Sequence, residues 1–351
     1  MKQPVLHVVG ARPQFIKLSP VVQAFKTLCV PFKVVHTGQH YDYAMSDLHF
    51  DVLGLDEPDY NLDIGSAGHA AQTANMLVGI EEVLIKEKPA LVVVYGDTNS
   101  TLAGALCAAK LCIPIAHVEA GVRSFDRSMP EEINRVLTDR ISTHHFCPTA
   151  NAVDLLLKEG IEGILTGDVM LDVLLRFSNL EIQQDYSPPF ILVTIHRAEN
   201  TNQKNRFLAI WEALKRLSRD IPIVFPVHPR TRNMYADIIE KHEEGINIVE
   251  PVSYLKMIAM IRDASCIITD SGGVQKEAFL LKTPCVTVRD TTEWPETVQA
   301  GANCLVETDA ALICSAVFEM MERSFPASAN PFGDGSAGFH IAQFIKENCF
   351  T

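Results

Sequence analysis

The sequence predicts an α/β fold made of two doubly wound, Rossmann-like domains. Short apolar runs alternate with stretches of helical period, which is typical of a parallel sheet covered by helices on both faces. This alternation fills the first half of the chain and starts again in the second half. The length of 351 residues also favours two domains, because single hydrophobic cores stop growing at about 250–300 residues.

The first half contains a series of apolar runs that we interpret as buried strands. These runs are Val5–Val9, Phe32–His36, Leu91–Tyr95, Ile113–Val118 and His144–Cys147. The helical patterns between them are Pro20–Leu28, Ala70–Glu87, Ser100–Leu111 and Glu131–Ile141. A strand followed by a helix and another strand predicts parallel neighbours joined by helical crossovers.

The second half repeats the scheme with its own strands and helices. Its predicted strands are Phe190–Ile195, Ile221–Val227, Ile246–Val249, Cys266–Thr269 and Cys285–Val288. Its predicted helices are Lys204–Leu217, Met234–Lys241, Tyr254–Arg262, Gln275–Lys282 and Ala310–Arg323. We therefore expect a first domain over residues 1–168 and a second over 169–337, with a final helix over 338–351 that rejoins the first domain. The carboxyl ends of the strands are expected to face a ligand-binding cleft between the domains.

Composition excludes several classes of function. The formal net charge of −13, without a long basic run, argues against a nucleic-acid or anionic membrane partner. Nine cysteines occur without a Cys-x-x-Cys pair, which indicates reduced thiols in a cytoplasmic protein. No signal peptide and no apolar stretch of membrane-spanning length is found in the sequence.

Three carboxylates follow predicted strands or begin a predicted helix. Asp97 ends one apolar run, Glu119 ends the next, and Glu131 lies in the first turn of a helical pattern. Each has a structural alternative: Asp97 as a helix N-cap, Glu119 as a partner of Arg123, and Glu131 as a favourable charge at a helix start. Three carboxylates around one crevice favour proton transfer over coincidence.

Cationic and polar side chains follow the first two strands. Arg12 and Lys17 would point at an anion near a helix N-terminus, although a capped turn with solvated cations explains them equally well. Gln39 and His40 follow the second strand in a loop that could bind a ligand. The structural alternative is an ordinary polar loop.

A glycine loop in the second half opens a helix after an apolar strand. Ser271, Gly272 and Gly273 would offer a hydroxyl and backbone N–H groups to a diphosphate, and Glu277 lies one turn further, within reach of a ribose diol. The loop matches neither the Gly-x-Gly-x-x-Gly nor the Walker pattern. Its structural alternative is a glycine turn with an N-cap.

Two histidines also follow strands of the second half. His196 and His228 have no spacing that supports a metal site, so a phosphate contact is the better interpretation, with a satisfied loop histidine as the alternative for His228. Arg289 and Glu293 lie in the loop after the last predicted strand. No metal and no cofactor is predicted.

The order of these motifs resembles a known family over essentially the whole chain. The motifs are Gly10-Ala-Arg-Pro with Lys17, Thr37-Gly-Gln-His40, Gly96-Asp-Thr98, His117-Val-Glu-Ala-Gly121, Pro130-Glu-Glu-Ile-Asn-Arg135, His196-Arg197, Pro226-Val-His228, Asp270-Ser-Gly-Gly-x-Gln275 with Glu277, and Arg289-Asp-Thr-Thr-Glu293. In this order they resemble the non-hydrolysing UDP-N-acetylglucosamine 2-epimerases. The resemblance implies a glycosyltransferase-B-like architecture, a UDP-sugar substrate and a homodimer.

The resemblance also implies roles for individual residues. Asp97, Glu119 and Glu131 are implied to be catalytic carboxylates, with Lys17 and Arg135 near the sugar. The diphosphate ligands would be Ser271, Gly272 and Gly273, assisted by Arg12 and His196, and Glu277 would bind the ribose. The implied reaction removes the C2 proton, eliminates UDP to leave a 2-acetamidoglucal, and adds UDP back with protonation of the other face, without a metal or nicotinamide.

Several alternatives remain open at this point. The motifs resemble equally well the branch that acts on UDP-2,3-diacetamido-2,3-dideoxyglucuronic acid. Allosteric bacterial members carry a Gln where this chain has Asp42, which leaves activation by a second UDP-sugar open. A hydrolysing epimerase, a retaining glycosyltransferase of similar fold and a nucleotide-sugar-binding module are the other candidates.

Overall fold

The computed structural model describes residues 3–39, 53–177, 186–239, 241, 243–325 and 330–350. The chain divides into two compact units: unit 1 is Met1–Arg176 with Asn330–Thr351, and unit 2 is Phe177–Ala329. The first boundary follows residue 176, eight residues later than the predicted boundary after residue 168. The second follows residue 329, eight residues earlier than the predicted boundary after residue 337. The segments 169–176 and 330–337 belong to unit 1 in this division. No helix in the described ranges is long and apolar enough to cross a membrane.

Unit 1 is built on a parallel sheet with the strand order β3-β2-β1-β4-β5-β6-β7. Its strands are β1 (Val5–Val9), β2 (Phe32–His36), β3 (Tyr60–Asn61), β4 (Leu91–Tyr95), β5 (Ile115–Val118), β6 (His144–Cys147) and β7 (Ile164–Leu165). The direction of winding reverses between β1 and β4, which are paired directly. In doubly wound sheets, ligands bind at the carboxyl ends of the strands beside this reversal.

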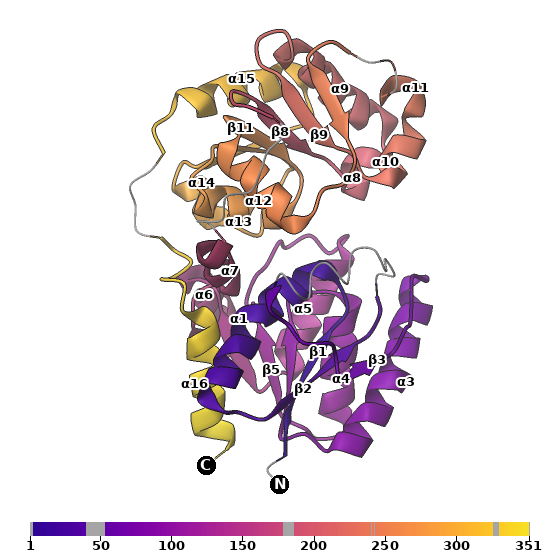
Figure 1. Ribbon diagram of the computed structural model, residues 1–351, viewed down its shortest axis with the longest axis vertical. Helices are drawn as coiled ribbons and strands as arrows, with labels where there is room; N and C mark the ends of the chain where they lie inside the picture. Colours follow the sequence, from indigo (N-terminus) through magenta and orange to yellow (C-terminus); the bar gives the residue numbers. More distant parts are fainter. Residues whose placement is uncertain are drawn as a thin grey trace. The chain divides into compact units, whose positions relative to one another are not determined.

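The helices of unit 1 cover both faces of this sheet (Figure 1). They are α1 (Arg12–Leu28), α3 (His69–Glu87), α4 (Asn99–Lys110), α5 (Pro130–Ile141), α6 (Ala150–Lys158), α7 (Val169–Phe177) and α16 (Ala337–Cys349). Buried Leu6, Val8, Val92 and Val94 form a core with side chains of α3 and α4.

Helix α1 begins at Arg12, whereas the sequence predicted its start at Pro20. The side chain of Gln14 accepts hydrogen bonds from the N–H groups of Gly10 and Ala11, at 2.8 and 3.0 Å, which caps the helix eight residues earlier. Pro13 occupies the first turn, where its missing N–H costs nothing, and Pro20 is accommodated inside the helix. This early start puts Arg12 and Lys17 on one helix at the carboxyl end of β1.

Helix α16 packs against α1 within unit 1, as Figure 1 shows. A Cβ atom added to Gly338 would lie 2.7 Å from the backbone of Pro20, so only glycine allows this approach. The carboxylate of Asp172 in α7 accepts hydrogen bonds from the N–H groups of Ala337 and Gly338 at 3.1 and 2.7 Å. Burial raises the pKa of Asp172 to about 6. The C-terminal segment is thus an integral part of unit 1.

Unit 2 contains a second parallel sheet with the strand order β10-β9-β8-β11-β12-β13. Its strands are β8 (Ile191–Thr194), β9 (Ile223–Pro226), β10 (Ile246–Val249), β11 (Cys266–Thr269), β12 (Cys285–Val288) and β13 (Asn303–Val306). Winding reverses between β8 and β11, the pair equivalent to β1 and β4 in unit 1. The predicted α/β class and its parallel sheets are confirmed.

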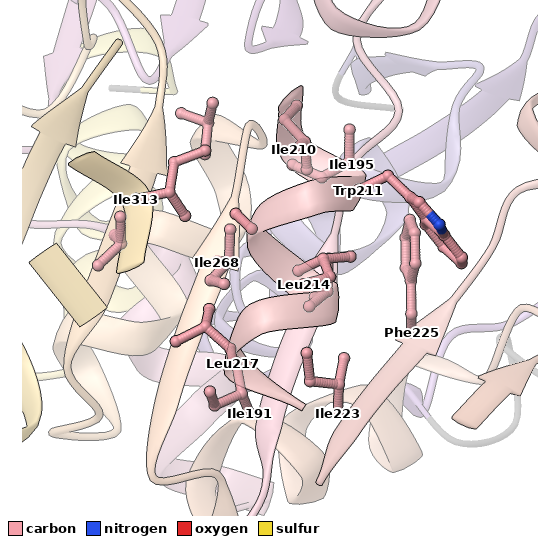
Figure 2. Packing of buried hydrophobic residues seen from close by; sticks show 14 of the residues in the cluster. Ile191, Ile195, Ile210, Trp211, Leu214, Leu217, Ile223, Phe225, Ile268 and Ile313 are labelled. Atoms are coloured by element: carbon pink, nitrogen blue, oxygen red, sulfur yellow. The ribbon is translucent and has the colours of Figure 1, made fainter. Parts of the chain in front are cut away.

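The helices of unit 2 bury an aliphatic core against the sheet. They are α8 (Ala198–Thr201), α9 (Lys204–Leu217), α10 (Pro229–Met234), α11 (Ala236–Ile239), α12 (Tyr254–Asp263), α13 (Gly272–Leu280), α14 (Pro295–Gln299) and α15 (Ala310–Glu322). Figure 2 shows Trp211, Leu214 and Leu217 of α9 over Ile191 and Phe225 of the sheet. The helix predicted over Met234–Lys241 is wrong, because Tyr235 separates two shorter helices, α10 and α11.

Candidate active site

Lys17 and Glu119 form a largely buried ion pair at the carboxyl ends of β1 and β5. The Nζ atom of Lys17 lies 2.8 Å from Oε1 of Glu119, with side-chain exposures of 12% and 10%. Glu119 has a φ of +71°, in the left-handed region that non-glycine residues seldom occupy. Such backbone strain is typical of functional sites. The alternative partner for Glu119, Arg123, is wrong, since Arg123 binds Asp139 and Glu159 instead.

Asp97 and Arg135 form a second ion pair one strand away. The guanidinium of Arg135 in α5 donates to Oδ2 of Asp97, and Arg135 is buried whereas Asp97 is 27% exposed. The side-chain amide of Asn134 donates to the backbone carbonyl of Asp97 at 2.9 Å. Asp97 is not the N-cap of α4, because Thr98 fills that position. Because Tyr95 pairs with Val118, Asp97 and Glu119 emerge from neighbouring strands.

Glu131 and Glu132 lie in the same helical turn but have different surroundings. Glu131 is exposed, and its side chain makes no hydrogen bond or ion pair with any residue that the structure describes. Glu132 is buried and accepts hydrogen bonds from Ser124 N and Oγ and from Phe125 N, at 2.8 to 3.0 Å. Glu132 also pairs with Arg135 at 3.1 Å. The structure thus joins Asp97 to Glu132 through Arg135 but leaves Glu131 open to solvent.

The end of β2 lies close to the start of α4. Oε1 of Gln39 accepts hydrogen bonds from Ser100 Oγ at 2.7 Å and from Ser100 N at 3.2 Å. Gly10 permits this packing, because an added Cβ would lie 2.0 Å from Thr37 Oγ1 and 2.1 Å from Ser100 Oγ. Half-buried Arg12 occupies the first position of α1. His40 lies outside the described residues.

In unit 2, the glycine loop forms the N-terminus of α13. Ser271 is the N-cap and its hydroxyl accepts from Val274 N at 3.5 Å, while Gly272 and Gly273 occupy the first two helical positions. The unpaired N–H groups of a helix start, together with the helix dipole, make this segment suited to an anion. Glu277 is buried one turn further along the same helix.

Buried Asp270 ties this loop to the end of β8. Its carboxylate accepts hydrogen bonds from the backbone N–H groups of His196 and Arg197 at 3.0 to 3.2 Å, and from the amide of Asn200 at 3.1 Å. Nδ1 of His196 lies 3.4 Å from Oδ1 of Asp270, and the imidazole is half exposed. Asp270 therefore positions His196 beside Ser271.

Glu293 bridges two arginines beside the same loop. Arg289 binds Glu293 through both guanidinium NH groups, at 2.6 and 3.1 Å, and Arg197 binds it at 3.3 Å. A Cβ atom on Gly272 would lie 3.3 Å from Oε2 of Glu293, so this cluster adjoins the start of α13. Two arginines therefore share the carboxylate of Glu293. Arg197, Arg289 and the start of α13 thus lie together at the ends of β8, β11 and β12.

His228 lies at the end of β9, next to β8, and has a local structural role. It is exposed and caps α10, its Nδ1 atom accepting from Arg230 N at 3.2 Å. Within the described ranges, no group of three or more His, Cys, Asp or Glu side chains could hold a metal ion.

Comparison with known proteins identifies the family. The sequence profile described as UDP-N-acetylglucosamine 2-epimerase matches residues 26–346. The chain belongs to this epimerase family. The expectation of an isomerase related to the non-hydrolysing UDP-N-acetylglucosamine 2-epimerases is therefore confirmed, as is the glycosyltransferase-B-like fold class of that family.

Relatives within the epimerase family match along their full lengths. The UDP-2,3-diacetamido-2,3-dideoxy-D-glucuronate 2-epimerase of Pseudomonas aeruginosa is 46% identical, covering 98% of this chain and 99% of the relative. The UDP-N-acetylglucosamine 2-epimerase of Methanocaldococcus jannaschii is 45% identical, covering 96% and 97%. A crystal structure of the latter enzyme, in complex with UDP-GlcNAc and UDP, matches with a TM-score of 0.91 and 43% identity, covering 99% and 100%.

Sequence reasoning missed several buried or half-buried residues that hold the epimerase motifs in place. Glu132, Asp139, Asp270 and Arg197 were not predicted as site residues. Glu132 and Arg197 each follow a predicted residue directly in the sequence, and this position within the motifs could have identified them as site residues. Asp139 gave no such signal, because its role depends on contacts across the fold.

Proposed function

We propose that the chain interconverts UDP-N-acetylglucosamine and UDP-N-acetylmannosamine, or a close UDP-2-acetamido sugar, without hydrolysis. The observation that carries this proposal is the presence of two cation–carboxylate pairs, Lys17–Glu119 and Arg135–Asp97, at the carboxyl ends of neighbouring strands. Family membership and the full-length match to named epimerases support it.

The proposed reaction assigns proton transfer to unit 1. A carboxylate takes the C2 proton, the electrons of the C2–H bond form a C1=C2 double bond, and the C1–O bond breaks with UDP leaving as an anion. UDP then adds back to C1 while a proton is delivered to the opposite face of C2. Asp97, Glu119 and Glu131 are proposed to supply and accept these protons, with Lys17 and Arg135 near the sugar.

Nucleotide binding is assigned to unit 2. Ser271, Gly272, Gly273 and His196 are proposed to bind the diphosphate, with Arg12 of unit 1 assisting, and Glu277 to bind the ribose. Positive charge at this position stabilises the departing UDP, because negative charge develops on the diphosphate as the C1–O bond breaks. Gln39, His40, His228, Arg289 and Glu293 complete the proposed substrate-binding set.

Deuterium incorporation tests the reaction directly. The protein is incubated in D2O with UDP-N-acetylglucosamine, and the C2 position of recovered UDP-sugar is examined by NMR. We expect deuterium at C2 and formation of the manno epimer, with no free sugar. Release of free N-acetylmannosamine would instead identify a hydrolysing enzyme, and the absence of exchange with every UDP-2-acetamido sugar offered would overturn the proposal.

Amide variants of the carboxylates separate catalysis from binding. Asp97→Asn, Glu119→Gln and Glu131→Gln should each lose C2 exchange while binding UDP with unchanged affinity by calorimetry. Unaltered turnover in all three would favour a mechanism without these groups. Glu131→Gln is the most informative of the three, because the structure leaves that carboxylate exposed.

A second candidate substrate is UDP-2,3-diacetamido-2,3-dideoxyglucuronate. The observation that favours it is the 46% identity to the Pseudomonas aeruginosa 2-epimerase named for that sugar. The archaeal UDP-N-acetylglucosamine 2-epimerase is 45% identical, so identity alone does not separate the two. Comparing kcat/KM for both UDP-sugars, with the same protein preparation, decides between them.

A homodimer in the cytoplasm completes the proposal. The family resemblance supports the dimer, and the reduced-thiol composition supports the compartment. Sedimentation equilibrium should give twice the mass of 38.8 kDa, and a monomer at micromolar concentration would contradict the assembly.

A further inference from the structure

A buried ionic network contacts the turns that carry the proposed carboxylates Asp97 and Glu119. It consists of His117 on β5, Asp139 on α5, Arg123 in the loop after β5, and Glu159 at the end of α6. Nδ1 of His117 lies 2.6 Å from Oδ1 of Asp139, and NH1 of Arg123 lies 2.6 Å from Oδ2. Nε of Arg123 lies 2.8 Å from Oε1 of Glu159. Of these four side chains only Glu159 is appreciably exposed, so the network lies in the interior of the protein.

The second ring nitrogen of His117 contacts the turn that carries Asp97. Nε2 of His117 lies 2.7 Å from the carbonyl oxygen of Gly96. Gly96 has a φ of +62°, and its amide N–H donates to Val118 O at 2.9 Å. Because the peptide bond is planar, a hydrogen bond to the Gly96 carbonyl fixes the plane from which Asp97 projects.

The hydrogen-bond pattern favours a proton on each ring nitrogen of His117. A backbone carbonyl can only accept, so Nε2 must be the donor there. Oδ2 of Asp139 accepts from Arg123 and from Gly121 N, at 3.2 Å for the latter, and the adjacent guanidinium favours the ionised carboxylate. An ionised carboxylate also only accepts, so Nδ1 is a donor as well. Burial raises the pKa of Asp139, but the charges and hydrogen bonds of His117 and Arg123 outweigh it and lower that pKa.

The same network reaches the other elements of the proposed site. Asp139 lies one helical turn after Arg135, on the same face of α5, and Arg135 binds the Asp97 carboxylate directly. Asp139 also binds Gly121 N, two residues after Glu119. One carboxylate therefore links the turns that bear Asp97 and Glu119 to the helix that bears Arg135.

We propose that His117 and Asp139 form a positioning pair, in which an imidazolium held by Asp139 fixes the Gly96–Asp97 peptide for C2 proton transfer. This inference rests on the proposed function. Neither side chain is assigned contact with the substrate; both act through Gly96 and Gly121. The opposite charges of His117, Arg123, Asp139 and Glu159 compensate each other, which makes their burial tolerable.

The test compares two variants that each remove one carboxylate charge from this network. Asp139→Asn keeps the size of the side chain but cannot hold the imidazolium by charge. We expect kcat for C2 deuterium exchange to fall about tenfold or more, with KM and UDP affinity within about twofold of wild type. Glu159→Gln removes a charge at the far end, beyond Arg123, and is expected to keep kcat near the wild-type value.

Equal losses of kcat in the two variants would show that the network serves stability alone, and an unaltered kcat in Asp139→Asn would also overturn the proposal. Thermal unfolding checks that both variants are folded. Should Asp139→Asn fail to fold, the wild-type protein labelled with ¹⁵N-histidine still decides: both ring nitrogens of His117 should carry protons at pH 7. A neutral His117 tautomer would overturn the inference. Absence of exchange in the wild type would instead contradict the proposed function, while the NMR result still tests the pair.

Discussion

Arg289 and Glu293 form a two-point ion pair in which almost no surface of either side chain is exposed. Two guanidinium nitrogens of Arg289 bind the two carboxylate oxygens of Glu293, and a second arginine, Arg197, binds the same carboxylate. This arrangement fixes the orientation of Arg289 beside Gly272. It also makes Glu293 the counter-ion for two cations that would otherwise repel each other.

Removing the Glu293 charge should therefore destabilise unit 2. Breaking a buried ion pair by removing one partner costs about 3–5 kcal/mol, because the remaining charge is left unpaired. We expect Glu293→Gln to lower the free energy of unfolding by about 3 kcal/mol in urea. The matched control is Glu212→Gln, which breaks a half-exposed Arg–Glu pair of the same sequence spacing. That control should change stability by less than about 1 kcal/mol, and equal effects would contradict the assigned burial cost.

Lys17 should matter for turnover more than for nucleotide affinity. Lys17→Met keeps the aliphatic stem but leaves Glu119 without the ammonium 2.8 Å away. Because Glu119 loses its counter-ion, we expect C2 exchange to fall by about 100-fold, the lower end of the range for general acid–base catalysis, while UDP affinity stays unchanged. Lys26→Met is the control, since Lys26 lies on the same helix and pairs with exposed Asp56. A similar loss of activity in both variants would argue against a role for the buried pair.

Gly10 should tolerate no side chain. The Cβ atom of Gly10→Ala would lie 2.0 Å from Thr37 Oγ1 and 2.1 Å from Ser100 Oγ, and both hydroxyls are buried. Overpacking of this kind costs about 1–3 kcal/mol, so we expect a lower unfolding midpoint by differential scanning calorimetry. Gly68→Ala places a Cβ in open space at the N-cap of α3, so it should lower the midpoint by much less than Gly10→Ala does. A wild-type midpoint for Gly10→Ala would show that β1 and α4 can separate.

His7 should make the fold sensitive to acid. His7 is completely buried, and burial lowers its pKa from 6.5 to about 3. As pH falls below 6.5, the unfolded chain takes up a proton that the folded chain refuses, so stability is lost between about pH 6.5 and pH 3. The loss approaches about 1.4 kcal/mol per pH unit within that window.

His7→Gln can test this contribution because glutamine keeps a hydrogen-bonding group for Tyr95, which lies 2.7 Å from His7 Nδ1. Urea unfolding of both proteins at several pH values between 4 and 7 gives the two slopes. The variant should have the shallower slope, whatever the cost of the substitution at neutral pH. Parallel slopes would place the acid sensitivity elsewhere.

The sequence predicted strands better than helix starts, for a physical reason. Val5–Val9 and Leu91–Tyr95 are runs of buried residues whose ends coincide with the observed strands. The start of α1 was predicted eight residues too late, at Pro20, because the side chain of Gln14 caps the helix at Arg12. Short-range patterns do not reveal such a cap reliably.

The sequence predicted which residues belong to the candidate site but not which of them form ion pairs. Placement of Asp97 and Glu119 at strand ends followed from the alternation of strands and helices. Their partners did not, because Arg135 is 38 residues from Asp97 and Lys17 is 102 residues from Glu119. Only the fold brings such pairs together. For the same reason, the structural alternative that paired Glu119 with Arg123 is wrong, because the fold gives Arg123 the carboxylate of Asp139.

The docking of α16 on α1 has a consequence for synthesis on the ribosome. Residues of unit 1 emerge first and last, while all of unit 2 emerges in between. Domains fold as units during translation, so the nascent unit 1 exposes the α1 surface around Pro20 until the chain beyond unit 2 has been made. Unit 2 can therefore reach its final packing before unit 1 does. When all of unit 2 has been made, unit 1 still lacks its last helix, α16.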